Sequence, residues 1–195
     1  MVNPQHPAAV VAGNVEVSQT IVDALYGCLG VLAGSQGTMN NFTFGNDTGL
    51  NYYETICGGT GAGRDHPGCD AVHSHMTNTR LPDPEILEFR FPLLVESFSI
   101  RRGSGGRGKQ RGGDGIERRI RFKAPMVVSI LANRREVAPF GLEGGGAGEV
   151  GKNWVERAGT RAVEALGNRG SVELDDGDVF VIHTPGGGAF GALEE

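Results

Sequence analysis

Residues 54–80 concentrate the side chains of this chain that can transfer protons or bind a metal. Glu54, Asp70, His73 and His75 lie around a glycine-rich turn. His73 and His75 are two positions apart, so in an extended run both imidazoles would project from one face. Imidazole and carboxylate groups exchange protons in catalysis, and glycine-rich backbone beside such groups is typical of a reaction site. The segment therefore predicts one wall of an active site.

Three interpretations of the histidine pair follow from the residues. With Asp70 or Glu54, His73 and His75 could hold a divalent metal, which imidazole and carboxylate ligands suit. They could instead polarise or protonate a substrate. In the third interpretation both are hydrogen-bonded residues of a polar loop. Spacing alone leaves all three open.

The cysteines give a weaker signal. Cys57 and Cys69 flank the glycine turn, and a cysteine nucleophile would need a nearby imidazole such as His66 or His73. Cysteines more often fill cores as inert thiols, so we do not predict a nucleophile. The chain has 3 cysteines and none forms a CxxC pair, which argues against a disulfide framework and favours a reducing compartment.

Glycine dominates the composition, with 33 residues in a chain of 195. The glycines cluster without a three-residue period at 58–63, 103–115, 141–151 and 186–191, where we expect tight turns and close backbone approaches. Gly186–Gly191 matches GxGxxG, but too few residues follow it for the helix that a dinucleotide site requires.

Charge and hydropathy exclude two further classes of protein. The net charge of −5 argues against nucleic-acid binding driven by bulk charge, including the interpretation of the Arg/Gly run at 104–113 as a nucleic-acid segment. No basic leader and no apolar run of ~20 residues is present, so we expect no membrane association and a cytoplasmic location.

The elements that must position these residues predict an α+β fold. One main N-terminal helix is expected over 14–33, starting at Asn14 and stopping at Gly34. Its apolar residues recur at helical spacing and form a stripe: Ile21, Val22, Leu25, Cys28, Leu29 and Leu32. Pro84 suits the first position of a short helical turn.

Most of the remaining periodicity predicts strands. These are expected at 41–44, 52–56, 91–100, 115–122 and 126–131, with a hairpin formed by 171–174 and 178–183 around Asp175-Asp-Gly177. No βαβ alternation occurs, so the C-terminal half should be predominantly antiparallel. We expect one domain over 1–195, with a possible subdivision into 1–90 and 91–195.

Six motifs in order resemble one family, the hydantoinase B/5-oxoprolinase proteins, and specifically their C-terminal part. The motifs are 12–23 (AGNVEVSQTIVD), 34–45 (GSQGTMNNFTFG), 53–63 (YETICGGTGAG), 68–80 (GCDAVHSHMTNTR), 111–115 (RGGDG) and 184–188 (TPGGG). The resemblance covers essentially the whole chain.

The resemblance implies a part in ATP-dependent opening of cyclic amides such as 5-oxoproline or hydantoins. Relatives carboxylate acetone or acetophenone instead. It also implies a hydantoinase A-like ATPase component as partner, where ATP would phosphorylate the substrate, and an N-terminal B-type half that this chain lacks. A divalent metal would be held mainly by those absent segments, with His73 and His75 as possible further ligands.

The family motifs place Glu54, Asp70, His73, His75 and Asn78 along the cleft. We expect the first four to act in catalysis, and Gly59, Gly61, Asn78 and Arg80 to bind substrate. In this hypothesis the glycine turn offers N–H groups to an oxyanion, a histidine protonates the departing ring nitrogen, and Glu54 or Asp70 orients that histidine. The alternative is a non-catalytic module that docks the ATPase component.

Overall fold

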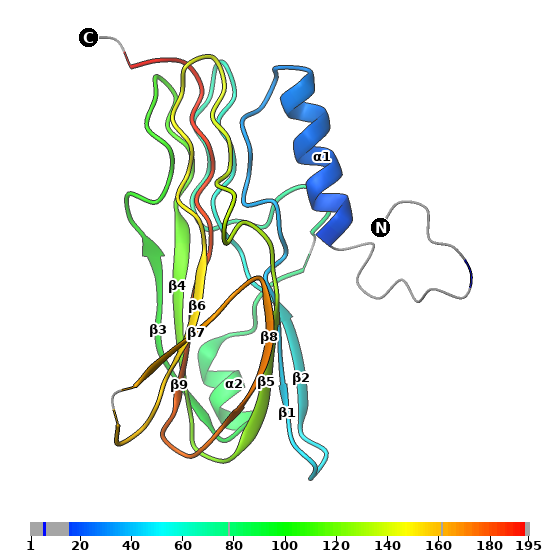
Figure 1. Ribbon diagram of the computed structural model, residues 1–195, viewed down its shortest axis with the longest axis vertical. Helices are drawn as coiled ribbons and strands as arrows, with labels where there is room; N and C mark the ends of the chain where they lie inside the picture. Colours follow the sequence, from blue (N-terminus) through cyan, green and yellow to red (C-terminus); the bar gives the residue numbers. More distant parts are fainter. Residues whose placement is uncertain (1–5, 7–15, 78, 161, 194–195) are drawn as a thin grey trace.

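The computed structural model describes residues 6, 16–77, 79–160 and 162–193. Figure 1 shows a long molecule with strands in its lower part and extended segments beside a helix in its upper part. The elements in chain order are α1 (Glu16–Cys28), β1 (Asn41–Gly45), β2 (Asn51–Thr55), α2 (Pro84–Arg90), β3 (Leu93–Arg101), β4 (Gly115–Phe122), β5 (Met126–Leu131), β6 (Lys152–Glu156), β7 (Val163–Leu166), β8 (Arg169–Leu174) and β9 (Val179–His183). Helices together with antiparallel sheets agree with the expected α+β class.

The lower part is a sandwich of two sheets, with strand orders β2-β1-β5-β8 and β3-β4-β9-β6-β7. Every neighbouring strand pair in both sheets is antiparallel. Burial alternates along β4 and β5, as it does when one face of a sheet packs on a core. The inner faces meet in a single cluster that includes Phe42, Phe122, Val128 and Phe180. In the first sheet, β1 and β2 from before residue 90 pair with β5 and β8 from after it.

The predicted hairpin at 171–183 is wrong. β8 pairs with β5, whereas β9 pairs with β4 and β6 in the other sheet. The turn between them crosses from one sheet to the other. Asp178 fixes this crossing, because its carboxylate accepts hydrogen bonds from the N–H groups of Ala158 (2.7 Å) and Asp175 (3.1 Å) and from Arg157 (2.8 Å).

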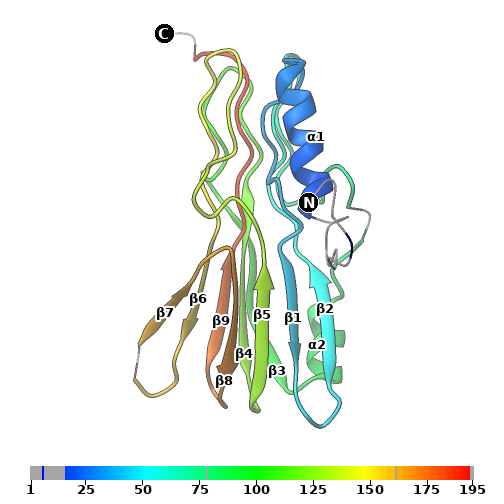
Figure 2. The same ribbon diagram turned by 45° about the vertical axis from the view of Figure 1, so that its right-hand side comes forward.

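The upper part brings the glycine clusters together, and we call it the glycine bundle: segments 33–37, 58–63, 104–113, 139–149 and 185–190, which run side by side in Figures 1 and 2. Three successive N–H groups, of Gly186, Gly187 and Gly188, donate to three different segments, at the carbonyls of Glu149, Gly113 and Gly34 (3.1, 2.8 and 2.7 Å). A backbone with three residues per turn, of the polyproline II kind, gives this pattern.

Glycine is required in the bundle because the backbones touch. A Cβ added to Gly187 would lie 1.9 Å from the carbonyl oxygen of Thr60, and one added to Gly188 would lie 1.9 Å from that of Phe140. Real Cβ atoms do not approach backbone so closely, so larger residues would separate the segments. Peptide hydrogen bonds between irregular segments thus replace sheet pairing in this half of the molecule.

Helix α1 ends earlier than the sequence predicts. Gly30 has a φ of +65°, its N–H donates to Gly27 O, and the Val31 N–H donates to Tyr26 O (3.0 and 3.1 Å). These two bonds form a Schellman motif, which stops the helix at Cys28. Gly34, the predicted stop, instead bonds Phe140 in the bundle.

The orientation of α1 is also unexpected. Its buried residues are the polar Glu16, Gln19 and Asp23. An apolar helix stripe ordinarily faces a core, but Leu25 is 57% exposed and Leu29 is 71% exposed. The helix therefore docks on the rest of the molecule through hydrogen bonds of these polar residues and turns its apolar stripe outward.

Helix α2 begins as predicted, with Pro84 at its start and the Asp83 carboxylate accepting from the Glu85 N–H (2.9 Å). No helix in the described part of the chain is long and apolar enough to span a bilayer.

Candidate functional site

The turn that carries the histidines is held against α1. The Gln19 side-chain amide donates to the carbonyl of Ser74 (2.9 Å) and to the Thr77 hydroxyl (2.7 Å). Ala71 and His75 have positive φ values of 52° and 53°. The backbone is therefore not extended here, and the premise that the two imidazoles share one face of a strand does not hold.

His75 forms a pair with Asp23 of α1. The distance from His75 Nε2 to Asp23 Oδ1 is 2.8 Å, and the two side chains are 6% and 1% exposed. The Ser35 N–H also donates to Asp23 Oδ1 (3.0 Å), and Arg134 approaches Oδ2 (3.2 Å). The Tyr26 ring packs edge-on against the imidazole. A buried carboxylate with these partners fixes the orientation of His75.

Sequence reasoning assigned the orienting role to Glu54 or Asp70 and did not consider Asp23. One signal was present, because Asp23 is the last residue of the first family motif and the only acidic residue after the first turn of an otherwise uncharged helix. An acidic residue at that place in an apolar pattern indicates a buried polar contact.

His73 differs from His75 because part of its ring lacks a partner. The imidazole is half-buried, and its Nδ1 is buried without a hydrogen bond among the described residues. Burial lowers the pKa of His73 below the usual histidine value. The imidazole is therefore neutral at pH 7 and can accept a proton at a ring nitrogen. A buried polar atom without a partner is uncommon in native proteins and is costly to maintain.

Glu54 lies in the core of the sandwich, away from contact with either histidine. Arg118 Nε is 3.0 Å from Glu54 Oε1, and the Tyr52 hydroxyl donates to Oε2 (2.6 Å). Burial raises the pKa of Glu54, while the positive charge of Arg118 acts in the opposite direction. Glu54 is on β2 and Arg118 on β4, so this ion pair joins the two sheets.

Asp70 lines a cleft that neither histidine lines. Arg111 binds both of its carboxylate oxygens (2.8 and 3.0 Å), and the Asp114 N–H donates to it (2.8 Å). The Arg111 hydrogen bonds hold the pKa of Asp70 below its usual range. The cleft has a volume of about 370 Å³, and arginines 102 and 107 line it together with glycines. The structure thus gives Glu54 and Asp70 arginine partners instead of the histidines.

The glycine turn at 58–63 has no free peptide donor. The Gly59 N–H donates to Pro185 O (3.0 Å), and the Gly61 N–H donates to the Ser35 hydroxyl (3.0 Å). The N–H groups of the other four residues in this turn also donate inside the protein. A Cβ on Gly59 or Gly61 would lie within 2 Å of a neighbouring carbonyl oxygen. In this structure both glycines serve close packing.

Among the remaining predicted residues, Asn78 lies outside the described part of the chain, and Arg80 is exposed. All three cysteines are free thiols. Burial raises the pKa of Cys57 to about 11, so it is an unreactive thiol at neutral pH. Cys69 is exposed.

No group of three histidine, cysteine, aspartate or glutamate side chains suited to a metal ion forms within the described residues. His75 uses its Nε2 on Asp23, and His73 has no carboxylate or imidazole partner there. A structural or catalytic zinc-type site needs three or four protein ligands. These residues do not fit a complete metal site without ligands from elsewhere.

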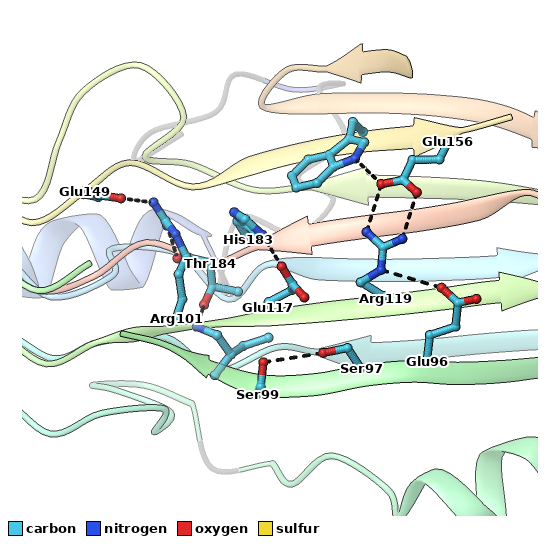
Figure 3. A network of polar contacts seen from close by, with 12 residues as sticks. Glu96, Ser97, Ser99, Arg101, Glu117, Arg119, Glu149, Glu156, His183 and Thr184 are labelled. Atoms are coloured by element: carbon cyan, nitrogen blue, oxygen red, sulfur yellow. Dashed lines mark hydrogen bonds and ion pairs between the residues drawn. The ribbon is translucent and has the colours of Figure 1, made fainter. Parts of the chain in front are cut away.

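The outer face of the β3-β4-β9-β6 sheet carries a separate polar network (Figure 3). Arg119 binds both oxygens of Glu156 (2.9 and 2.8 Å) and approaches Glu96 (3.6 Å). His183 contacts Glu117 (2.8 Å), and burial lowers the pKa of this imidazole. These contacts link neighbouring strands and give Glu117 and Arg119 of β4 a structural role.

Comparisons of the sequence and of the fold with known proteins point to one family. The family described as Hydantoinase B/oxoprolinase matches residues 1–193. A 5-oxoprolinase of Dictyostelium discoideum is 49% identical over 98% of this chain, and 5-oxoprolinase 1 of Arabidopsis thaliana is 48% identical over 97%. The chain spans only 15% of the length of each of these relatives.

Solved structures share the fold. The ATP-dependent caprolactamase of Pseudomonas jessenii superposes with a TM-score of 0.80 at 22% identity, covering 97% of this chain and 36% of the caprolactamase chain. Nucleotide-free acetone carboxylase gives 0.67 at 21% identity, covering 82% and 26% of the two chains. With the family model matching residues 1–193 and 5-oxoprolinases 49% and 48% identical across almost the whole chain, the chain belongs to the hydantoinase B/oxoprolinase family.

Proposed function

We propose that this chain is the C-terminal domain of a B-type component in an ATP-dependent enzyme that opens a cyclic amide of the 5-oxoproline type. The observation that carries the proposal is the 49% identity to a 5-oxoprolinase across 98% of the chain. A D-/L-hydantoinase component of Pseudomonas sp. is 29% identical, which supports the lactam ahead of the hydantoin ring as substrate. An A-type ATPase component would supply the phosphorylated substrate.

His73 and His75 take different roles in this proposal. His73, with a lowered pKa and an unpaired buried Nδ1, accepts a proton from the attacking water and then gives it to the ring nitrogen as the C–N bond breaks. His75 is a positioning residue, since its imidazole is committed to Asp23 and anchors the turn to α1. Glu54 and Asp70 stabilise the structure around the histidine turn through their ion pairs with Arg118 and Arg111. The remaining ligands of any metal, and the rest of the cleft, come from the part of the B-type component outside this chain.

Single substitutions in the assembled enzyme test these roles. We expect His73→Ala to lower ring opening at least 100-fold while ATP hydrolysis by the partner continues, because proton transfer contributes roughly 10²–10⁴-fold to rates. His75→Ala should lower ring opening less and should reduce protection of the turn from hydrogen exchange. His66→Ala is the matched control, because His66 is an exposed imidazole of the same segment. Coupled ring opening at the wild-type rate in both the His73 and His75 variants would overturn the proposal.

The reaction product distinguishes ring opening of a cyclic amide from carboxylation of a ketone. Acetone carboxylase shares the fold, so carboxylation of a ketone is the competing chemistry. Incubation of the assembled enzyme with ATP and either 5-oxoproline or acetone plus bicarbonate would give glutamate in the first case and acetoacetate in the second. We expect glutamate.

A further inference from the structure

Large apolar side chains are exposed on the outward side of α1, on the residues that follow it and on the histidine turn bonded to it, and we call this set the α1 apolar face. Its residues are Ile21 (41% exposed), Leu25 (57%), Tyr26 (40%), Leu29 (71%), Val31 (51%) and Met76 (60%). Ile21, Leu25 and Leu29 are four residues apart, so they lie along one side of the helix. Figures 1 and 2 both show α1 along the outside of the glycine bundle.

The charges of α1 are all on the other side. The helix contains only two ionisable acidic residues, Glu16 and Asp23, and both are buried. Glu16 accepts hydrogen bonds from Thr38, Met39, Asn41 and Asn133. A helix at a permanently solvated surface normally carries charged residues on its outer side. The outer side of α1 carries none, which is typical of a surface that is covered in the working protein.

The lengths of the relatives indicate what covers it. This chain spans 33% of the Pseudomonas hydantoinase component, 35% of a Methanocaldococcus jannaschii relative and 36% of the caprolactamase chain. About two thirds of each of these three chains therefore lies outside the part matched here. That polypeptide is the occupant to which the apolar face is suited, because segments of one folded protein meet through apolar surfaces of this kind.

We propose that the remaining polypeptide of the B-type component packs on the α1 apolar face and, by doing so, covers the His75–Asp23 pair. Tyr26 contacts the His75 ring on one side, and Met76 follows it in the chain. The His75 and Asp23 side chains are already 6% and 1% exposed, and a segment resting on Tyr26 and Met76 adds a second layer over them. The histidine turn is bonded to α1 through Gln19, so a segment docked on α1 has a fixed position relative to the histidines. This inference rests on the proposed B-type role but not on the identity of the substrate.

Photo-crosslinking in the assembled B-type protein tests the proposal without measuring activity. A photoreactive amino acid at position 25 should crosslink to residues of the B-type component outside the 195-residue chain, and mass spectrometry identifies the crosslinked peptides. The same amino acid at position 163 is the matched control, because Val163 is 65% exposed on the edge strand β7 and Leu25 is 57% exposed. Crosslinks from position 25 to a second copy of α1, to the ATPase component alone, or only to solvent would overturn the proposal.

A substitution provides the second readout. Leu25→Asp places a charge on the apolar face and should raise carbene labelling of Leu29 at least about fivefold in the assembled protein, whereas Val163→Asp should not change it. Because the Leu25 side chain is mostly exposed, the fold of the 195-residue chain should persist, which circular dichroism checks. Equal labelling of Leu29 in the wild-type assembly and in the Leu25→Asp variant would show that the face is not covered. Absence of 5-oxoproline turnover by the wild-type assembly, with the crosslinks from position 25 present, would instead contradict the proposed function.

Discussion

Substitution of Gly187 by alanine tests the glycine bundle most directly. The added Cβ would lie 1.9 Å from the carbonyl oxygen of Thr60 and 2.2 Å from its carbonyl carbon. Normal contact needs at least about 3.4 Å, so the two segments must separate by more than 1 Å in a region packed on all sides. The bundle has no flexible side chain at this contact that could move instead.

The cost follows from the hydrogen bonds at the contact. Gly187 donates to Gly113 O (2.8 Å) and accepts from Gly106 N–H (2.8 Å), and Thr60 O accepts from Gly113 N–H (2.9 Å). Each such bond contributes about 1 kcal/mol net, and overpacking adds about 1–3 kcal/mol. We expect Gly187→Ala to lower the free energy of unfolding by about 4 kcal/mol, a large part of the ~5–15 kcal/mol typical of a domain.

Urea unfolding followed by fluorescence of Trp154, the single tryptophan, measures this effect. With a slope of about 2 kcal/mol per molar urea, the midpoint should fall by about 2 M. Gly167→Ala is the matched control, because a Cβ there meets no atom within 4 Å and its φ is not in the left-handed region. The control should be neutral or stabilising by about 0.4–1 kcal/mol. A Gly187→Ala protein within about 0.5 kcal/mol of wild type, or an equal loss in the control, would refute the close-packing argument.

Three further predictions concern ion pairs. Arg118→Met should lower the free energy of unfolding in urea by about 3–5 kcal/mol, because the Glu54 carboxylate stays buried without its positively charged partner. Adding Glu54→Leu should recover much of this loss. An Arg118→Met protein as stable as wild type would contradict the prediction. Arginine lowers the pKa of Glu156 to about 2, so its contribution is present above about pH 4.5 and disappears as pH falls toward 2. Exposure reduces that contribution to about 1 kcal/mol, and Glu156→Gln should flatten the acid side of the stability profile by this amount. Asp23→Asn should weaken the contact with His75 and speed hydrogen exchange in the histidine turn, and unchanged exchange would remove the assigned positioning role.

Most strand positions were predicted because their signal is local, but β6 (Lys152–Glu156) and β7 (Val163–Leu166) were not predicted. The predicted segments 115–122 and 126–131 coincide with β4 and β5, because buried residues alternate with more exposed ones along both, as at Ile116, Ile120 and Phe122 of β4. Pro84 likewise marked the start of α2. Pairing between strands is not local, so the turn at 175–177 resembled a hairpin turn although its strands enter different sheets.

The candidate site was predicted less completely. The sequence located the histidine turn and its family, but it did not indicate that Asp23 would be the carboxylate beside His75 or that Glu54 would pair with Arg118 in the core. Both contacts join segments more than 50 residues apart. Residue types and spacing predict which groups can ionise, whereas burial and charge partners decide how they do so.

The sequence by itself determined the family, most strand positions and the segment that carries the histidines, because motif order and short-range periodicity are properties of the chain alone. Only the tertiary structure decided the outward orientation of the apolar side of α1, the separate environments of His73 and His75, and the packing role of the glycines. These depend on backbone and charge contacts between distant segments. Three buried polar side chains on one face of α1 bond to three different places: Glu16 to Met39, Gln19 to Ser74 of the histidine turn, and Asp23 to Ser35 of the glycine bundle. These bonds turned the apolar face outward.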